Sequence, residues 1–101
     1  MVSFRLLEHD GQSTRALAAR VASALNEGTV ALILDLAERH IDGPLLHLLV
    51  VTDKALAARS GCLIVLCAEG PARVLHASGI DVHLSLAQSL HEALDHVAAH
   101  G

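Results

Sequence analysis

The stretch that decides the fold is TVALILDL, residues 29–36, an almost uninterrupted apolar run of strand length. A strand with one wet face alternates apolar and polar side chains, so a continuous run is typical of a strand covered on both faces. CLIVLC, residues 62–67, has the same character. We therefore expect these two runs to form adjacent parallel strands at the centre of a sheet.

Turn signals and helix-period patterns divide the rest of the chain into elements that alternate with these strands. The Asp42-Gly43-Pro44 segment supplies a capping residue and an early proline, both typical of a helix start. The alternation predicts an α/β domain, with a small sheet of four to five mostly parallel strands and right-handed crossovers, flanked by four helices. In chain order we expect strands at 2–8, 29–36, 62–67 and 80–84, and helices at 13–26, 42–60, 70–78 and 85–99.

Leucine spacing assigns a core stripe to each long helix, and glycines mark helix ends. The first helix repeats Leu17, Val21 and Leu25. The second stripe is predicted as Leu45, Leu49, Thr52 and Leu56, and the last as Leu86, Leu90, Leu94 and Val97. Gly28, Gly61 and Gly79 each follow a predicted helix, which indicates left-handed caps.

Length and composition indicate one domain, residues 1–101, with no repeat or linker. The formal charge of -4 disfavours a nucleic-acid partner, and a single aromatic residue, Phe4, gives no platform for stacking bases. The longest apolar run, residues 45–51, is interrupted by His47 and is far shorter than the roughly 20 residues that span a bilayer. Because no export signal is visible either, we expect a cytoplasmic protein without membrane insertion.

The two cysteines, Cys62 and Cys67, lie five residues apart in one predicted strand. That spacing separates them by roughly 16 Å and points them to opposite faces. A disulfide needs Cα atoms within about 7 Å of each other, so we expect two free thiols in a reducing compartment.

Catalytic and cofactor-binding motifs are absent from the sequence. There is no G-x-G-x-x-G, no G-x-x-x-x-G-K-[ST] and no G-x-S-x-G, so neither a phosphate cradle nor a nucleophile elbow is indicated. We expect no enzyme activity and no cofactor. Glu92, His96 and His100 share one face of the last helix, but three side chains at a helix end leave a metal shell incomplete, and we expect no metal site.

Two segments resemble the STAS domain family. ILDLAERHIDGPLLHLLV, residues 33–50, is similar to its strand with a terminal aspartate-leucine pair, followed by an aspartate, two hydroxyl residues, glycine and leucine that open a helix. GCLIVLCAEGPARVLHASGID, residues 61–81, is similar to its glycine, apolar strand, proline and short helix. The resemblance covers the chain from about residue 11 to the end.

The antagonist branch of that family implies a protein-binding role. Such domains bind an anti-sigma factor, often a serine kinase of the histidine-kinase-like ATPase type, and so free the sigma factor; phosphorylation of the hydroxyl residue after the aspartate ends the binding. Asp42 matches the aspartate and Leu46 the leucine, whereas Gly43 and Pro44 stand at the hydroxyl positions and Leu45 at the glycine. The resemblance thus implies a partner surface without a phosphoacceptor. Its residues are Asp42, Gly43, Pro44, Leu45 and His47.

Two other readings stay open. The high hydropathy and short N-terminus also suit a STAS-like subunit of a transport or signalling assembly, such as a lipid-transport ATPase complex, and a small enzyme or nucleotide binder is a further alternative. Family members usually have two strands before the first helix, and this chain has room for about one. Either the sheet is one strand short or another chain covers its edge, which leaves a homodimer open.

Overall fold

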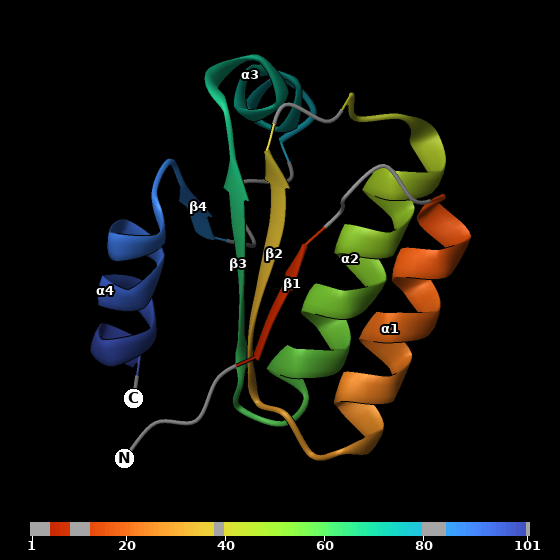
Figure 1. The fold of residues 1–101 in the computed structure, drawn as a ribbon, viewed down its shortest axis with the longest axis vertical. Helices are drawn as coiled ribbons and strands as arrows, with labels where there is room; N and C mark the ends of the chain where they lie inside the picture. The colour runs from red at the N-terminus through yellow and green to blue at the C-terminus, as the bar shows by residue number, and fades with distance from the viewer. Residues whose placement is uncertain (1–4, 9–12, 38–39, 80–84, 101) are drawn as a thin grey trace.

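The computed structural model describes residues 5–8, 13–37, 40–79 and 85–100, which form one sheet and four helices (Figure 1). The helices α1 and α2 lie side by side against one face of the sheet, and α4 lies against the other (Figure 1). In chain order the elements are β1 Arg5–Glu8, α1 Thr14–Asn26, β2 Ala31–Ala37, α2 Gly43–Ala57, β3 Cys62–Cys67, α3 Glu69–Ala77, β4 Ser85–Ala87 and α4 Leu90–His100.

The sheet has the order β1-β2-β3-β4, and every neighbouring pair is parallel. The two apolar runs pair with each other, Ile33 opposite Ile64 and Leu34 opposite Val65, which confirms the predicted central pair and the α/β class. Of the strand predicted at 2–8 the structure describes Arg5–Glu8, and the strand predicted at 80–84 lies outside the described residues.

The core has two parts, one on each face of the sheet. The larger part lies between the sheet and α1, α2 and α3, and the smaller part lies under α4. Leu34 belongs to the first and Ile64 to the second, and both are fully buried. The predicted stripe of α2 is confirmed residue by residue, while α1 buries Ala24 in place of the predicted Leu25, which is only partly buried.

The prediction for the last helix is wrong in its start and in most of its stripe. Residues 85–87 form β4 and pair with β3, so the helix begins only at Leu90. The predicted Val97 is buried and is confirmed, but the other buried position is Ala93, while the predicted Leu90 and Leu94 are exposed. Ala87, on the strand, completes that side of the core.

One of the three predicted glycine caps is also wrong. Gly28 and Gly79 have positive φ, as expected of left-handed caps, but after α2 the positive φ of 60° belongs to Ser60. Gly61 serves a different purpose: a Cβ there would lie 2.1 Å from the backbone oxygen of Val30. The glycine therefore lets β3 start in close contact with the chain that leads into β2, where the Cys62 N–H donates to the Val30 carbonyl at 2.9 Å.

The outer strand β1 is tied to α1 at both ends. The Arg20 guanidinium donates to the Glu8 carbonyl at 2.8 Å, and Arg5 pairs with Glu27. Cys62 and Cys67 are free and belong to opposite sides of the core, as predicted. Burial raises the pKa of both thiols, and the Asp35 carboxylate raises that of Cys67 further, so both stay protonated at neutral pH. Within the described ranges, no helix is long and apolar enough to cross a bilayer.

Truncation of either central strand should cost a large share of the stability. We expect Leu34→Ala and Ile64→Ala each to lower the free energy of unfolding by about 2 to 5 kcal/mol, because both side chains are fully buried and leave cavities. Urea unfolding followed by circular dichroism measures the change. Val51→Ala, at a side chain that is 49% exposed, is the control. Unchanged midpoints for both core variants would contradict this core.

Gly61→Ala should also destabilise, through overpacking against backbone that cannot move aside. Since the added methyl group would meet the Val30 carbonyl and lies 3.1 Å from that of Leu56, we expect a loss near the top of the about 1 to 3 kcal/mol typical of overpacking. Gly70→Ala, where a Cβ has open space, should change stability by less than about 1 kcal/mol. Equal melting temperatures for the two variants would refute the close approach.

Candidate partner-binding site

The end of β2 turns the chain toward the candidate site. The β2–β3 register shifts between Asp35 and Ala37, and Ala37 takes a left-handed φ of 50°. The Asp35 carboxylate accepts from the Ala37 N–H at 3.0 Å, and the Ala37 carbonyl accepts from the Ala68 N–H at 2.8 Å. These two hydrogen bonds hold a conformation that is unfavourable for a residue with a Cβ, and they fix the direction in which the chain leaves the sheet.

Asp42 begins α2 as its N-cap. Its backbone is extended, with φ of -106° and ψ of 177°, and its Oδ1 accepts from the Leu45 N–H at 2.9 Å. The Asp42 carbonyl accepts from the Leu46 N–H, also at 2.9 Å. Pro44 stands in the first turn, where its missing N–H has no partner to lose. The predicted helix start is thus confirmed, and the Asp42 carboxylate is already engaged by the backbone.

The structure divides the five predicted site residues into two groups. Asp42, Gly43, Pro44 and His47 are exposed, and a side chain added at Gly43 would meet open space. Leu45 is only 1% exposed and packs in the larger core. Leu45 therefore cannot touch a partner in this conformation, because the helix period that exposes Pro44 and His47 turns Leu45 toward the sheet.

The exposed face of α2 continues beyond the predicted residues. Val51 lies one turn after His47 and is 49% exposed, so Pro44, His47 and Val51 follow one another along the outer side of the helix. The sequence signal was the four-residue spacing of His47 and Val51, but the surrounding apolar run concealed which residues face outward. Val51 adds an apolar contact to a surface otherwise made of Asp42, Gly43 and an imidazole.

A hollow of about 240 Å³ lies beside the start of α2. His40 and Ile41, just before the cap, form one wall, and Gly70, Pro71 and Val74 of α3 form the other. The site therefore joins the two loops that follow β2 and β3, where ligands of α/β sheets usually bind. No spacing in the sequence indicates this hollow, because it depends on how α3 packs.

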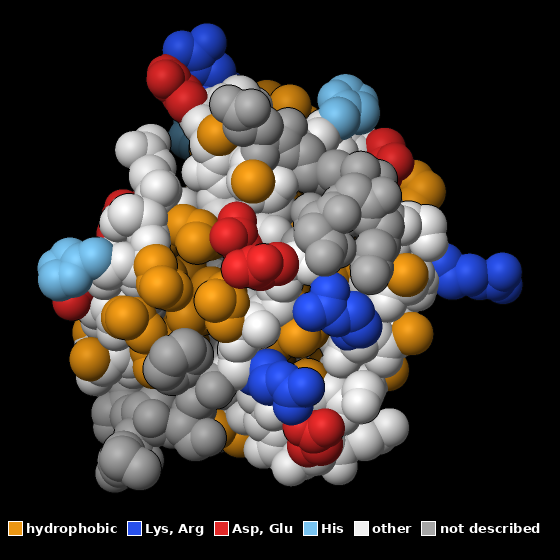
Figure 2. Space-filling view, viewed as in Figure 1, with side chains coloured by type: hydrophobic (Ala, Val, Ile, Leu, Met, Phe, Trp, Pro, Cys, Tyr) orange, Lys and Arg blue, Asp and Glu red, His pale blue; other side chains and the backbone are white. Residues whose placement is uncertain are grey.

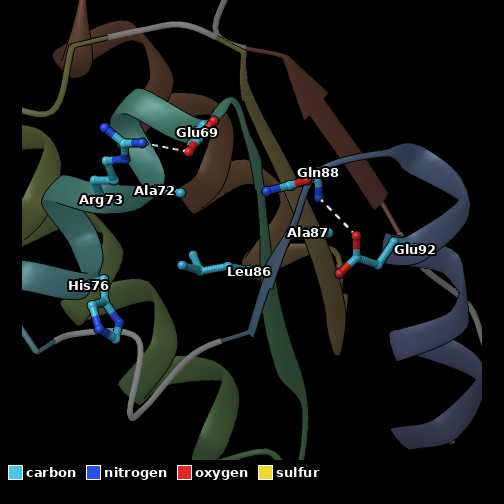
Figure 3. A pocket seen from close by; sticks show the side chains of 8 residues that line it. All are labelled: Glu69, Ala72, Arg73, His76, Leu86, Ala87, Gln88 and Glu92. Atoms are coloured by element: carbon cyan, nitrogen blue, oxygen red, sulfur yellow. Dashed lines mark hydrogen bonds and ion pairs between the residues drawn. The ribbon is translucent and has the colours of Figure 1, made fainter.

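A larger hollow, of about 580 Å³, lies away from the predicted site, between α3 and β4 (Figure 3). Leu86 points from β4 toward α3, Arg73 pairs with Glu69 at 2.6 Å, and the Glu92 carboxylate accepts from the Gln88 N–H at 3.2 Å. These charged groups are satisfied by one another, and the lining residues contain no nucleophile paired with a base. Sequence reasoning missed this hollow because it had assigned residue 86 to a helix.

Metal binding finds little support among the described side chains. The part of the chain that the structure describes contains no group of three His, Cys, Asp or Glu residues close enough to hold an ion. Glu92, one of the three residues considered from the sequence, caps the start of α4 instead: Ser89 Oγ accepts from its N–H and its carboxylate accepts from the Gln88 N–H.

Proteins with a similar fold are found among the solved structures. No family model matches the sequence, and no curated protein matches it significantly. The chain is similar to the crystal structure of an anti-sigma factor antagonist from Mycobacterium paratuberculosis, with a TM-score of 0.77 and 25% identity, over 96% of this chain and 86% of the other. It is also similar to the NMR structure of the protein TM1081, with a TM-score of 0.79 and 20% identity, over 94% of this chain and 82% of the other.

The match to the antagonist spans almost the whole chain. The resemblance to the STAS family noted in the sequence is therefore confirmed, and this chain folds as a STAS-type α/β domain with an anti-sigma factor antagonist among its structural neighbours.

Proposed function

We propose that this chain is a protein-binding regulator of the anti-sigma factor antagonist type, which sequesters an anti-sigma factor in the bacterial cytoplasm and so affects transcription. The observation that carries the proposal is the match to an antagonist over 96% of the chain. The exposed start of α2 supports it, because Asp42, Gly43 and Pro44 present a rigid, capped helix end to solvent. The domain acts by binding, without catalysis or a cofactor.

The binding surface we propose is the outer side of α2 with the hollow next to it. Pro44, His47 and Val51 offer an apolar strip with one imidazole, and the hollow between Ile41 and Val74 can take a partner's side chain. Protein interfaces are strongest where an anchor side chain of one partner fills a well-packed, desolvated pocket of the other and charged groups are few at the centre. The partner is then a protein with a complementary apolar surface, such as an anti-sigma factor of the serine-kinase ATPase fold.

A pull-down from the native cell tests this proposal. Capture of an ATPase-fold kinase or another anti-sigma factor supports it. Capture of a transporter subunit would favour the alternative role in a transport or signalling assembly and would refute sigma-factor regulation. Gly43→Asp serves as the bait control, since loss of the same partner links it to the start of α2.

Regulation by phosphorylation should be absent at the usual place. Incubated with its captured kinase and ATP, the protein should gain no phosphate on residues 42–45, because Asp42, Gly43, Pro44 and Leu45 carry no hydroxyl group. Intact-mass and peptide mass spectrometry measure this directly. Phosphate found on another residue, for instance the exposed Ser78, would mean that control has moved rather than disappeared; Thr52 is buried and is not available.

Gly43→Asp should abolish most of the binding and leave the fold intact. The new side chain meets open space, and a carboxylate at a helix N-terminus is electrostatically favourable. In an interface the same charge would be buried without a counter-ion at a cost of several kcal/mol, so affinity should fall about a hundredfold or more. Isothermal titration against the captured partner gives the affinity, and circular dichroism gives the fold.

Gly43→Asn is the matched control for this variant, because it adds nearly the same volume without charge. We expect Gly43→Asn to bind more tightly than Gly43→Asp by at least about tenfold. If wild type, Gly43→Asp and Gly43→Asn bind equally well, the interface lies elsewhere on the domain.

A further inference from the structure

The exposed leucines of α4 are the unusual feature of the surface. Among the described residues, five large apolar side chains are exposed, and three of them are single valines in separate segments. The other two, Leu90 and Leu94, lie one turn apart on α4 and are 44% and 36% exposed. Single exposed valines are ordinary, whereas paired leucines on one helix face are typical of a contact surface.

The apolar face of α4 is wider than the part that the sheet covers. Ala93 and Val97 are buried against the sheet, and Leu90 and Leu94 repeat the same spacing immediately beside them. Leu90 also shares a hollow of about 390 Å³ with the half-buried Leu66 of β3. Figure 2 shows apolar side chains gathered between α4 and the sheet, open to solvent.

Charges beside the leucines indicate what covers them. His91 and Asp95 lie on the outer side of α4, with Nε2 and Oδ2 3.6 Å apart, and both are largely exposed. When two copies of α4 pack antiparallel about a two-fold axis that passes near residues 92 and 93, in the first turns of the helix, Leu90 of each faces Leu94 of the other, and each His91 faces the other copy's Asp95. An imidazole N–H donates to a carboxylate in either protonation state. The surface is thus complementary to itself.

We propose that a second copy of this chain docks on Leu90 and Leu94 to form an antiparallel α4–α4 homodimer. This contact lies on the face of the sheet opposite α1 and α2. It leaves the start of α2 free for the regulatory partner, so the dimer presents two such surfaces.

Sedimentation velocity of the full chain over a range of concentrations tests the proposal. Wild type should pass from monomer to dimer, and Leu94→Asp should weaken association at least about tenfold because two carboxylates enter an apolar contact. Val51→Asp, at an exposed apolar position on α2, is the control and should dimerise like wild type. Wild type that stays monomeric at every concentration overturns the proposal, as does equal weakening by both substitutions.

Charge complementation tests the antiparallel arrangement without altering the leucines. His91→Glu places carboxylates opposite each other in its own dimer, and Asp95→Lys removes the carboxylate that accepts from the imidazole and puts an ammonium group there, so each variant alone should associate at least about tenfold more weakly than wild type. Their mixture pairs a carboxylate with an ammonium group and should restore the dimer. A mixture that stays as weak as its components excludes this arrangement. If Leu94→Asp instead removes the partner captured in the pull-down while wild type is monomeric, a different protein occupies the leucines.

Discussion

The pairing of β2 with β3 is the constraint on which the rest of the structure depends. Both strands are covered on both faces, so a register error would misplace two cores at once. A backbone hydrogen bond fixes the register at each end of the pair. Where the strands begin, Gly61 lets the Cys62 N–H donate to the Val30 carbonyl, and where they end, the Ala68 N–H donates to the carbonyl of Ala37, which has a left-handed conformation. The chain segments that lead to both walls of the candidate site begin at this second hydrogen bond.

The sequence predicts best those elements in which one continuous pattern of apolar residues marks the buried positions. The apolar runs of β2 and β3 and the stripe of α2 could be read directly, because every position that faces the core is apolar or, at Thr52, small. The end of the chain could not. β4 has only three residues, and its identity depends on pairing with β3, which no local pattern records. In α4 the leucine spacing favoured Leu90 and Leu94 as the buried face, whereas the sheet covers the smaller Ala93 together with Val97.

The candidate site shows the same division. Capping chemistry is local, so Asp42 and Pro44 marked the helix start correctly. Periodicity placed Leu45 correctly in the core stripe of the helix, whereas the family resemblance also placed it in the partner surface, from which its burial excludes it. The hollow between Ile41 and Val74 depends on the packing of α3 against the loop before α2. No spacing within either segment could reveal it.

The side of α2 that stabilises the fold is separate from the side that we propose binds the partner. Leu45, Leu49 and Leu56 face the sheet and belong to the larger core, while Pro44, His47 and Val51 contact solvent. Substitution on the outer side therefore costs little folding free energy, since no buried contact is lost. Gly43 tolerates a side chain especially well, because a Cβ added there would have no neighbouring side chain or other element within 4 Å. A residue without a hydroxyl group at this position is compatible with the fold for the same reason: the cap at Asp42, not the residue after it, holds the helix start in place.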